Sequence, residues 1–152
     1  MASVVNVTNI AGVREPLFDL ITSARFWPQW HPASRAVFGV TERPYQLGDL
    51  IHERVHIAGV ELIVTWRVAE HVRPSRVVLQ AVARPTRIIY GLEPRGTATE
   101  FRRELEYDEA EARQVAPGVT DWGRLLHAQS EEGLRRLKAL VEGILQQEQA
   151  AP

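Results

Sequence analysis

The segment His52-Glu53-Arg54-Val55-His56 has the residue types and the spacing of a zinc site. On a helix, the pattern His-Glu-x-x-His brings two imidazoles onto one face, where they bind zinc, and the glutamate serves as the base of a metalloprotease. On a strand, residues four apart are separated by about 13 Å, whereas each zinc–nitrogen bond is about 2.1 Å long. The chemistry of the motif therefore depends on the element that holds it.

The hydrophobic pattern around this motif predicts a strand. A helical spacing of apolar residues is also present, but the residues from Val60 to Val68 alternate directly after Ala58-Gly59. A hairpin with a two-residue turn is the simpler interpretation. Position 62, where the metalloprotease pattern would lead to a further ligand, is a leucine. We expect no metal, and the zinc metalloprotease through His52, Glu53 and His56 is a remote alternative.

Glu53 and Arg103 are charged residues at positions where strand alternation predicts apolar ones. Burying a charge costs several kcal/mol unless it is paired. We expect the two side chains to form an ion pair inside an apolar chamber, where they would orient a ligand. The alternative is a β-bulge in one of the two strands, which reverses the parity and exposes the charge.

Six runs of residues with a hydrophobic period of two predict six consecutive strands. Their connections are short and carry proline and glycine, which excludes the long crossovers of a parallel sheet. The runs are residues 33–40, 49–57, 60–71, 76–84, 86–93 and 97–107.

Helices are predicted on either side of this series of strands. A first strand at 3–10 precedes a helix at 14–22 and a helical turn within 26–30. After Thr120-Asp121, a helix of about 25 residues reaches about Gln147 and would be close to 40 Å long. Its apolar face comprises Leu126, Ser130, Gly133, Leu137, Leu140, Val141 and Ile144.

Alternation also assigns the residues of the sheet that face this helix. The inward set is Ile51, Glu53, Val55, Ile57, Val60, Leu62, Val64, Trp66, Val68, Val77, Leu79, Ala81, Ala83, Ile88, Tyr90, Leu92, Thr99, Phe101, Arg103, Leu105 and Tyr107. We expect a ligand to contact Trp30, Glu53, Val64, Trp66, Leu79, Tyr90, Phe101, Arg103, Gly133 and Leu137. If the protein is an enzyme, the catalytic candidates are Arg103, Glu53 and Tyr90. The histidines at 31, 71 and 127 are expected to be solvated.

The order of these elements resembles the SRPBCC superfamily, which includes START lipid-transfer domains, pollen-allergen-like proteins and the polyketide cyclase/dehydrase family. The matching segments are Phe18-Asp19-Leu20, Trp27-Pro28-Gln29-Trp30-His31-Pro32 and Gly133-Leu134-Arg135-Arg136-Leu137-Lys138. The resemblance covers nearly the whole chain. It implies an α+β helix-grip (START-like) fold: a curved seven-stranded antiparallel sheet wrapped around a long C-terminal helix, with two short helices after the first strand.

Composition limits the classes of protein that remain. The 152 residues fit one domain, 1–152, with a tail at 146–152 that is expected to fray. Eighteen basic and nineteen acidic residues give a net charge of −1, which argues against binding nucleic acid. There is no cysteine. The absence of a long apolar segment predicts no integral membrane association, and we expect a cytoplasmic protein, a monomer or homodimer, without a cofactor.

Three functions remain, because a fold does not decide a function. The first is binding of a small hydrophobic or amphipathic molecule between the sheet and the C-terminal helix. The second is an enzyme resembling polyketide cyclases and dehydrases, which would catalyse aldol cyclisation or dehydration. The third is binding of a protein partner on the outer face of the sheet, for which the mixed charges of that face give little support.

Overall fold

The computed structural model describes residues 1–150, which form one seven-stranded antiparallel sheet and four α-helices. The strands are β1 (Ala2–Ala11), β2 (Ser34–Gly39), β3 (Leu50–Ile57), β4 (Val60–Val72), β5 (Arg76–Ala81), β6 (Arg87–Arg95) and β7 (Ala98–Tyr107). The helices are α1 (Arg14–Ile21), α2 (Trp27–Trp30), α3 (Glu109–Val115) and α4 (Trp122–Ala150), with a 3₁₀ turn, η1 (Ala24–Phe26), before α2. The strand order β1-β7-β6-β5-β4-β3-β2 confirms the predicted helix-grip fold.

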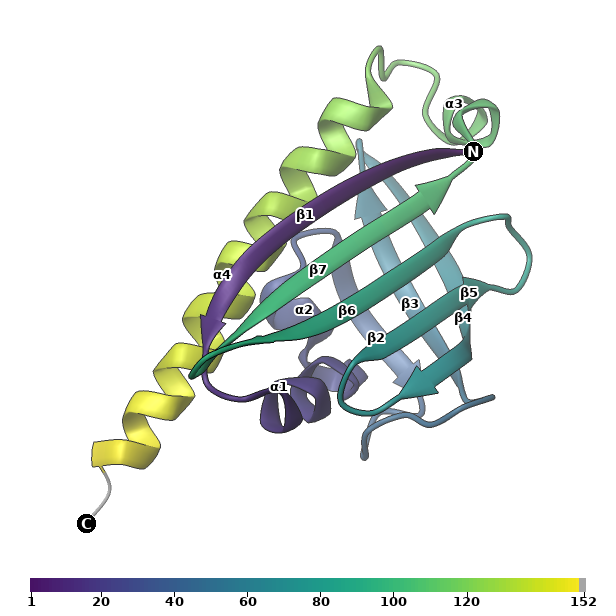
Figure 1. The fold of residues 1–152 in the computed structure, drawn as a ribbon. Helices are drawn as coiled ribbons and strands as arrows, with labels where there is room; N and C mark the ends of the chain where they lie inside the picture. The colour runs from purple at the N-terminus through teal and green to yellow at the C-terminus, as the bar shows by residue number, and fades with distance from the viewer. Residues whose placement is uncertain (151–152) are drawn as a thin grey trace.

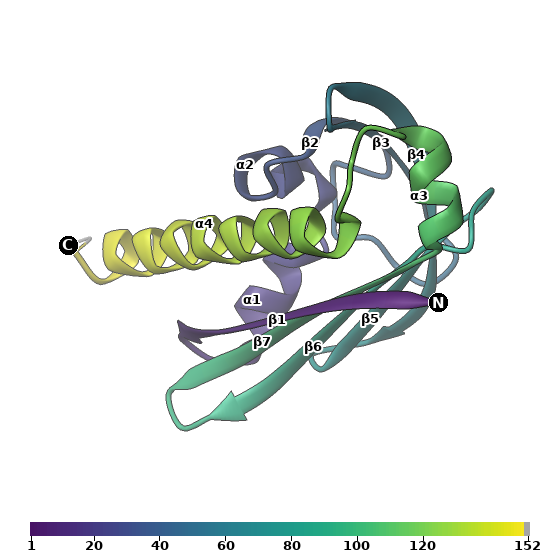
Figure 2. The same ribbon diagram turned by 90° about the horizontal axis from the view of Figure 1, so that it is seen from above.

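The sheet curves around the first part of α4, and the C-terminal end of α4 extends beyond it (Figures 1 and 2). Helix α4 runs alongside the edge strand β1 and is attached to it by polar contacts. Glu142 Oε2 accepts a hydrogen bond from the Ala11 backbone N–H (3.0 Å), and the Lys138 ammonium donates to the Asn9 carbonyl. These contacts occupy backbone groups that an exposed edge strand would leave free.

The pairing register decides which side chains face α4. β3 pairs with β4, and β7 with β6 and β1, without interruption. The irregularities lie elsewhere, between Ser34 and Ala36 on β2 and between Val68 and Glu70 on β4. Both Glu53 and Arg103 therefore keep the inward parity of their strands, and neither strand has the bulge that would expose them.

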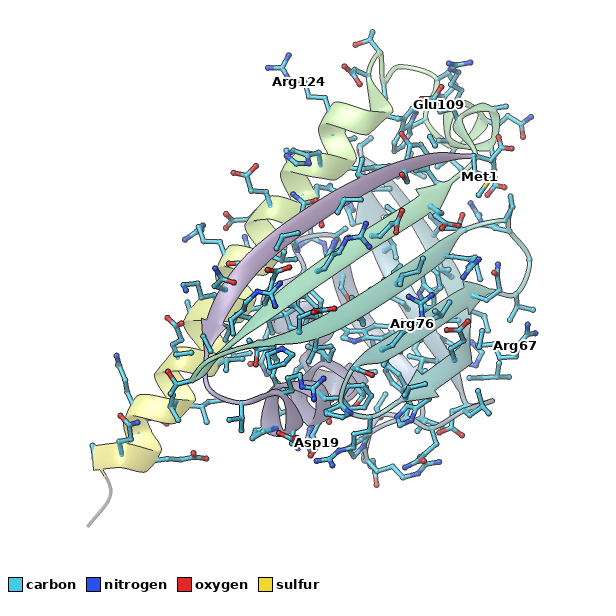
Figure 3. The ribbon with its side chains drawn as sticks, in the orientation of Figure 1. Met1, Asp19, Arg67, Arg76, Glu109 and Arg124 are labelled. Atoms are coloured by element: carbon cyan, nitrogen blue, oxygen red, sulfur yellow. The ribbon has the colours of Figure 1, made fainter. Side chains whose placement is uncertain are left out.

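The outer face of the sheet carries charged side chains together with isolated apolar ones. Figure 3 shows Arg67 and Arg76 on this side, and Arg76 Nε is 2.8 Å from a carboxylate oxygen of Glu70. Phe38 and Ile63 are also exposed, at 48% and 52%. The outer face is therefore less uniformly charged than the alternation predicted.

Three details differ from the predicted elements, apart from the additional helix α3. β5 ends at Ala81, so Ala83 lies in an exposed turn and does not face inward. Helix α4 continues to Ala150 because its last residues are good helix formers without a proline; residues 146–150 are thus helical, and 151–152 lie outside the described residues. Ile144 is 37% exposed because this end of α4 extends past the sheet.

Within residues 1–150, no helix combines the length and the apolar character that crossing a membrane requires.

The backbone conformation at the end of β2 requires a glycine at position 39. Its φ is +96°, and an added Cβ would lie 2.8 Å from the Leu50 carbonyl oxygen. We expect Gly39→Ala to lower the free energy of unfolding by about 2 kcal/mol, because both the strained φ and the overlap must be accommodated. Urea denaturation measures this loss. Gly118→Ala is the control, since its Cβ meets no atom within 4 Å; equal destabilisation by both would contradict the explanation.

Candidate functional site

A pocket lies between the inner face of the sheet, the first turns of α4, and helices α2 and α3. Its volume is about 160 Å³. Apolar side chains from β3, β4, β6 and β7 form most of its wall, among them Val55, Leu62, Val64, Ile88 and Leu105. Two buried charged residues, Glu53 and Arg103, interrupt this apolar lining.

The structure brings six of the ten predicted contact residues to this pocket. They are Trp30, Glu53, Val64, Trp66, Tyr90 and Arg103. Leu79, Phe101 and Leu137 are instead fully buried in the core and do not line the pocket. Gly133 lies where α4 crosses the end of α2, with an added Cβ 3.4 Å from the Trp30 carbonyl oxygen. Its small size allows this close helix contact, and it does not border the pocket.

Glu53 enters the pocket from β3 and is only 8% exposed. Its Oε1 accepts a hydrogen bond from the Trp66 indole Nε1 (3.1 Å), across the β3–β4 pair. Burial raises the pKa of Glu53 above its ordinary value, while the Trp66 indole and the charge of Arg103 act in the opposite direction. This carboxyl group therefore keeps its proton to a higher pH than an exposed glutamate.

Arg103 enters from β7 and is 5% exposed. One guanidinium nitrogen, Nη1, donates to the Ser130 hydroxyl on α4 (3.1 Å), whereas Nε has no hydrogen-bond partner. A guanidinium keeps its charge at any ordinary pH. The pocket thus contains a permanent buried cation whose hydrogen-bonding capacity is only partly used.

The predicted ion pair between Glu53 and Arg103 is not formed as a direct contact. Arg103 bonds to Ser130 and Glu53 to Trp66, and no salt bridge joins either residue to an opposite charge within residues 1–150. Strand parity brought both side chains to the same face, but the strands β3 and β7 lie far apart in the sheet order. The two groups influence each other only through space.

The aromatic side chains of α2 pack where the short helices meet the sheet. Trp27 and Trp30 are both buried and both border the pocket. Trp30 packs against the Tyr90 ring at a centroid distance of 6.3 Å. Burial raises the pKa of Tyr90, so its phenol is neutral.

His31 also borders the pocket, contrary to the expectation of a solvated turn histidine. Burial lowers the pKa of His31, and the charges of Arg103 and Arg136 add to this effect. Its Nδ1 accepts a hydrogen bond from the Ala33 backbone N–H (3.2 Å). The neutral ring therefore carries its proton on Nε2.

The two remaining histidines that were expected to be solvated have partners. The His71 ring packs edge-on against Phe18, with centroids 5.2 Å apart. His127 is half exposed, and its Nδ1 lies 3.2 Å from the Asn6 side-chain amide nitrogen. Neither residue lines the pocket.

Helix α3 and the start of α4 supply pocket residues that the sequence reasoning missed. Trp122, Ala112 and Val115 line the pocket at the end of the sheet where β7 finishes (Figure 1). The signal for α3 was present, because the Asp108 side chain caps it by accepting from the Glu111 N–H (3.0 Å). Arg84 and Glu111 form an ion pair of 3.2 Å at this end.

The His-Glu-x-x-His motif lies on strand β3, as predicted. Glu53 faces the pocket, whereas His52 is on the opposite face, stacked on Phe38 and 2.8 Å from the Thr65 hydroxyl. Glu53 therefore cannot act as a base on a metal held by the histidines. Residues 1–150 contain no group of three side chains suited to holding a metal ion.

Comparison with solved structures assigns the fold. A START superfamily protein from Mycobacterium smegmatis has a TM-score of 0.74 at 16% identity, covering 93% of this chain and 98% of that chain. A polyketide-cyclase-like protein from Corynebacterium glutamicum has a TM-score of 0.62 at 15% identity, covering 99% of this chain and 97% of that chain. A dimeric protein from Colwellia psychrerythraea has a TM-score of 0.67 at 16% identity, covering 93% of this chain and 97% of that chain. The fold of this chain is therefore the helix-grip fold of the START-like class.

The sequence itself narrows this class to a family. Residues 1–142 match the family described as "Polyketide cyclase / dehydrase and lipid transport". No curated protein matches the sequence. The chain belongs to the polyketide cyclase/dehydrase and lipid transport family.

Proposed function

We propose that the protein binds a small hydrophobic or amphipathic molecule in the pocket between the sheet and α4. The observation that carries this proposal is the buried Arg103, whose Nε lacks a partner beside a largely apolar wall. Apolar walls with a few oriented polar groups are typical of small-molecule sites. Membership of a family that includes lipid transport supports the same conclusion.

The size of the pocket limits the ligand. Its volume of about 160 Å³ is close to that of an engineered cavity of about 150 Å³ that binds benzene. Larger drug-like ligands occupy pockets of roughly 300–1,000 Å³. The ligand that fits this volume is therefore a single ring or a short chain.

A cyclase- or dehydratase-type enzyme is the second candidate, favoured by a proton-holding carboxyl group and a cation in one pocket. Arg103 would polarise a carbonyl group, and Glu53 in its ionised form would take the α-proton and then give it to the leaving hydroxyl, which departs as water. Tyr90 is neutral and would serve as a further hydrogen-bond donor. The pocket suits a small β-hydroxy carbonyl compound better than a folded polyketide chain. The test is whether the protein dehydrates such a substrate, measured by the loss of the substrate. We expect this activity to be absent in Glu53→Gln.

Filling the pocket tests the binding proposal. Val64 faces the pocket from the middle of β4, so Val64→Phe places a ring in the space of the ligand. We expect a molecule that co-purifies with the wild type from its own host to be absent from the variant. Native mass spectrometry detects the bound molecule, and thermal unfolding checks that the variant is folded.

Ile63→Phe is the matched control, because the neighbouring residue on β4 faces outward and is 52% exposed. It adds the same ring without entering the pocket and should retain the bound molecule. Loss of the molecule from both variants, or from neither, would contradict binding at this site.

A further inference from the structure

We infer that the ligand is a small organic acid whose carboxylate oxygens accept hydrogen bonds from the Arg103 guanidinium. The inference rests on the proposed function and adds the chemical class of the ligand.

Every unpartnered buried polar atom among the pocket-lining residues is a hydrogen-bond donor. These atoms are Trp30 Nε1, Arg103 Nε and Trp122 Nε1. Two acceptors of the same walls are already engaged, since Glu53 Oε1 accepts from the Trp66 indole N–H and His31 Nδ1 accepts from the Ala33 N–H. Leaving a buried donor without an acceptor is costly, and buried donors almost always have one. Three buried donors of the lining therefore lack an acceptor, and a ligand rich in acceptor oxygens would supply one.

The charge of the lining favours an acceptor that is negative. Arg103 is 5% exposed, and its identified partner is the neutral Ser130 hydroxyl. A buried guanidinium without a paired anion is strongly unfavourable, and a bidentate carboxylate is its best partner in geometry. An anion bound there would replace the counter-ion that residues 1–150 do not provide in direct contact.

The other ionisable groups around the site do not cancel this charge. Burial lowers the pKa of His31 and raises those of Tyr90 and Glu53, so each of the three is shifted toward its neutral form. At the α3 end of the pocket, Arg84 and Glu111 pair with each other. Arg103 is therefore the dominant charge for a molecule inside the pocket.

The test uses three ligands with one ring and different charges: benzoate, benzamide and benzylammonium. Each is titrated into the full-length protein near neutral pH, with NMR detection of the backbone signals and of the Arg103 Nε–H signal. We expect benzoate to bind at least about tenfold more tightly than benzamide, with benzylammonium weakest. Benzoate should also shift the Arg103 Nε–H signal, because this donor gains an acceptor.

Arg103→Met removes the charge and keeps an apolar side chain of similar length. We expect it to weaken benzoate binding by at least about tenfold and to change benzamide binding much less, which shows that the pocket is intact. If this variant does not fold, Arg103→Lys and the wild-type Nε–H signal provide the result. Lysine should retain a preference for benzoate, reduced because it lacks the planar pair of donors.

The outcomes separate the two proposals. Binding of benzamide as tight as that of benzoate would overturn the organic-acid inference and leave small-molecule binding standing. A preference for benzoate that persists in Arg103→Met would also overturn it. No binding of any of the three at this pocket would overturn the proposed function, and the inference with it.

Discussion

Replacing Trp30 by alanine is expected to lower the free energy of unfolding by about 3–5 kcal/mol. Trp30 is 1% exposed, packs against Tyr90, and its carbonyl oxygen lies against Gly133 of α4. Removing its ring leaves a large cavity where α2, the sheet and α4 meet. Chemical denaturation followed by circular dichroism measures the loss.

Gln29→Ala is the matched control, since the neighbouring side chain on α2 is exposed. It should change stability by less than about 0.5 kcal/mol. A second readout uses indole, which should raise the unfolding temperature of Trp30→Ala more than that of the wild type by occupying the vacated space. A loss below about 1 kcal/mol would show that Trp30 does not hold these layers together.

Replacing Glu53 by glutamine is expected to raise the free energy of unfolding relative to that of the wild type, and this difference should grow as the pH rises. Burial raises the pKa of Glu53 in the folded state above its ordinary value of 4.5. The folded state therefore binds this proton more tightly than the unfolded state. The stability linked to it is fully present below the unfolded pKa and is lost as the pH rises through the folded pKa. One pH unit between the two pKa values corresponds to about 1.4 kcal/mol.

The measurement is the difference in unfolding free energy between Glu53→Gln and the wild type from pH 4 to pH 8, a range of about four units around the window. Other carboxyl groups, such as Glu132 with a pKa of about 2, contribute equally to both proteins and cancel. Glu42→Gln is the control because this side chain is exposed. A difference that stays constant with pH would mean that Glu53 is ionised as readily as an exposed carboxylate.

The two buried charged residues of the pocket, Glu53 and Arg103, are unfavourable for folding, which supports a role in binding. A buried guanidinium with a free Nε and a buried carboxyl with a raised pKa each cost stability that an apolar core would not. Violations of the packing rules concentrate at functional sites, where a ligand offsets them. The organic-acid inference identifies the kind of ligand that would do so.

Much of the site was predictable because strand alternation is a local property. With an uninterrupted register, parity alone identifies Glu53, Val64, Trp66, Tyr90 and Arg103 as inward residues. Parity could not tell which inward residues border empty space. Leu79 and Phe101 share the inner face but pack solidly, because the helices fill the space above them.

Sequence alone determined the positions of the strands along the chain, the long terminal helix and the side of the sheet on which the two charges lie, because hydrophobic periodicity acts over a few neighbouring residues. Only the tertiary structure decided that Glu53 bonds to Trp66, that Arg103 bonds to Ser130, and that α3 and Trp122 close the pocket. These contacts join residues distant in the chain, and their geometry depends on how the sheet curves around α4. No local pattern carries that information.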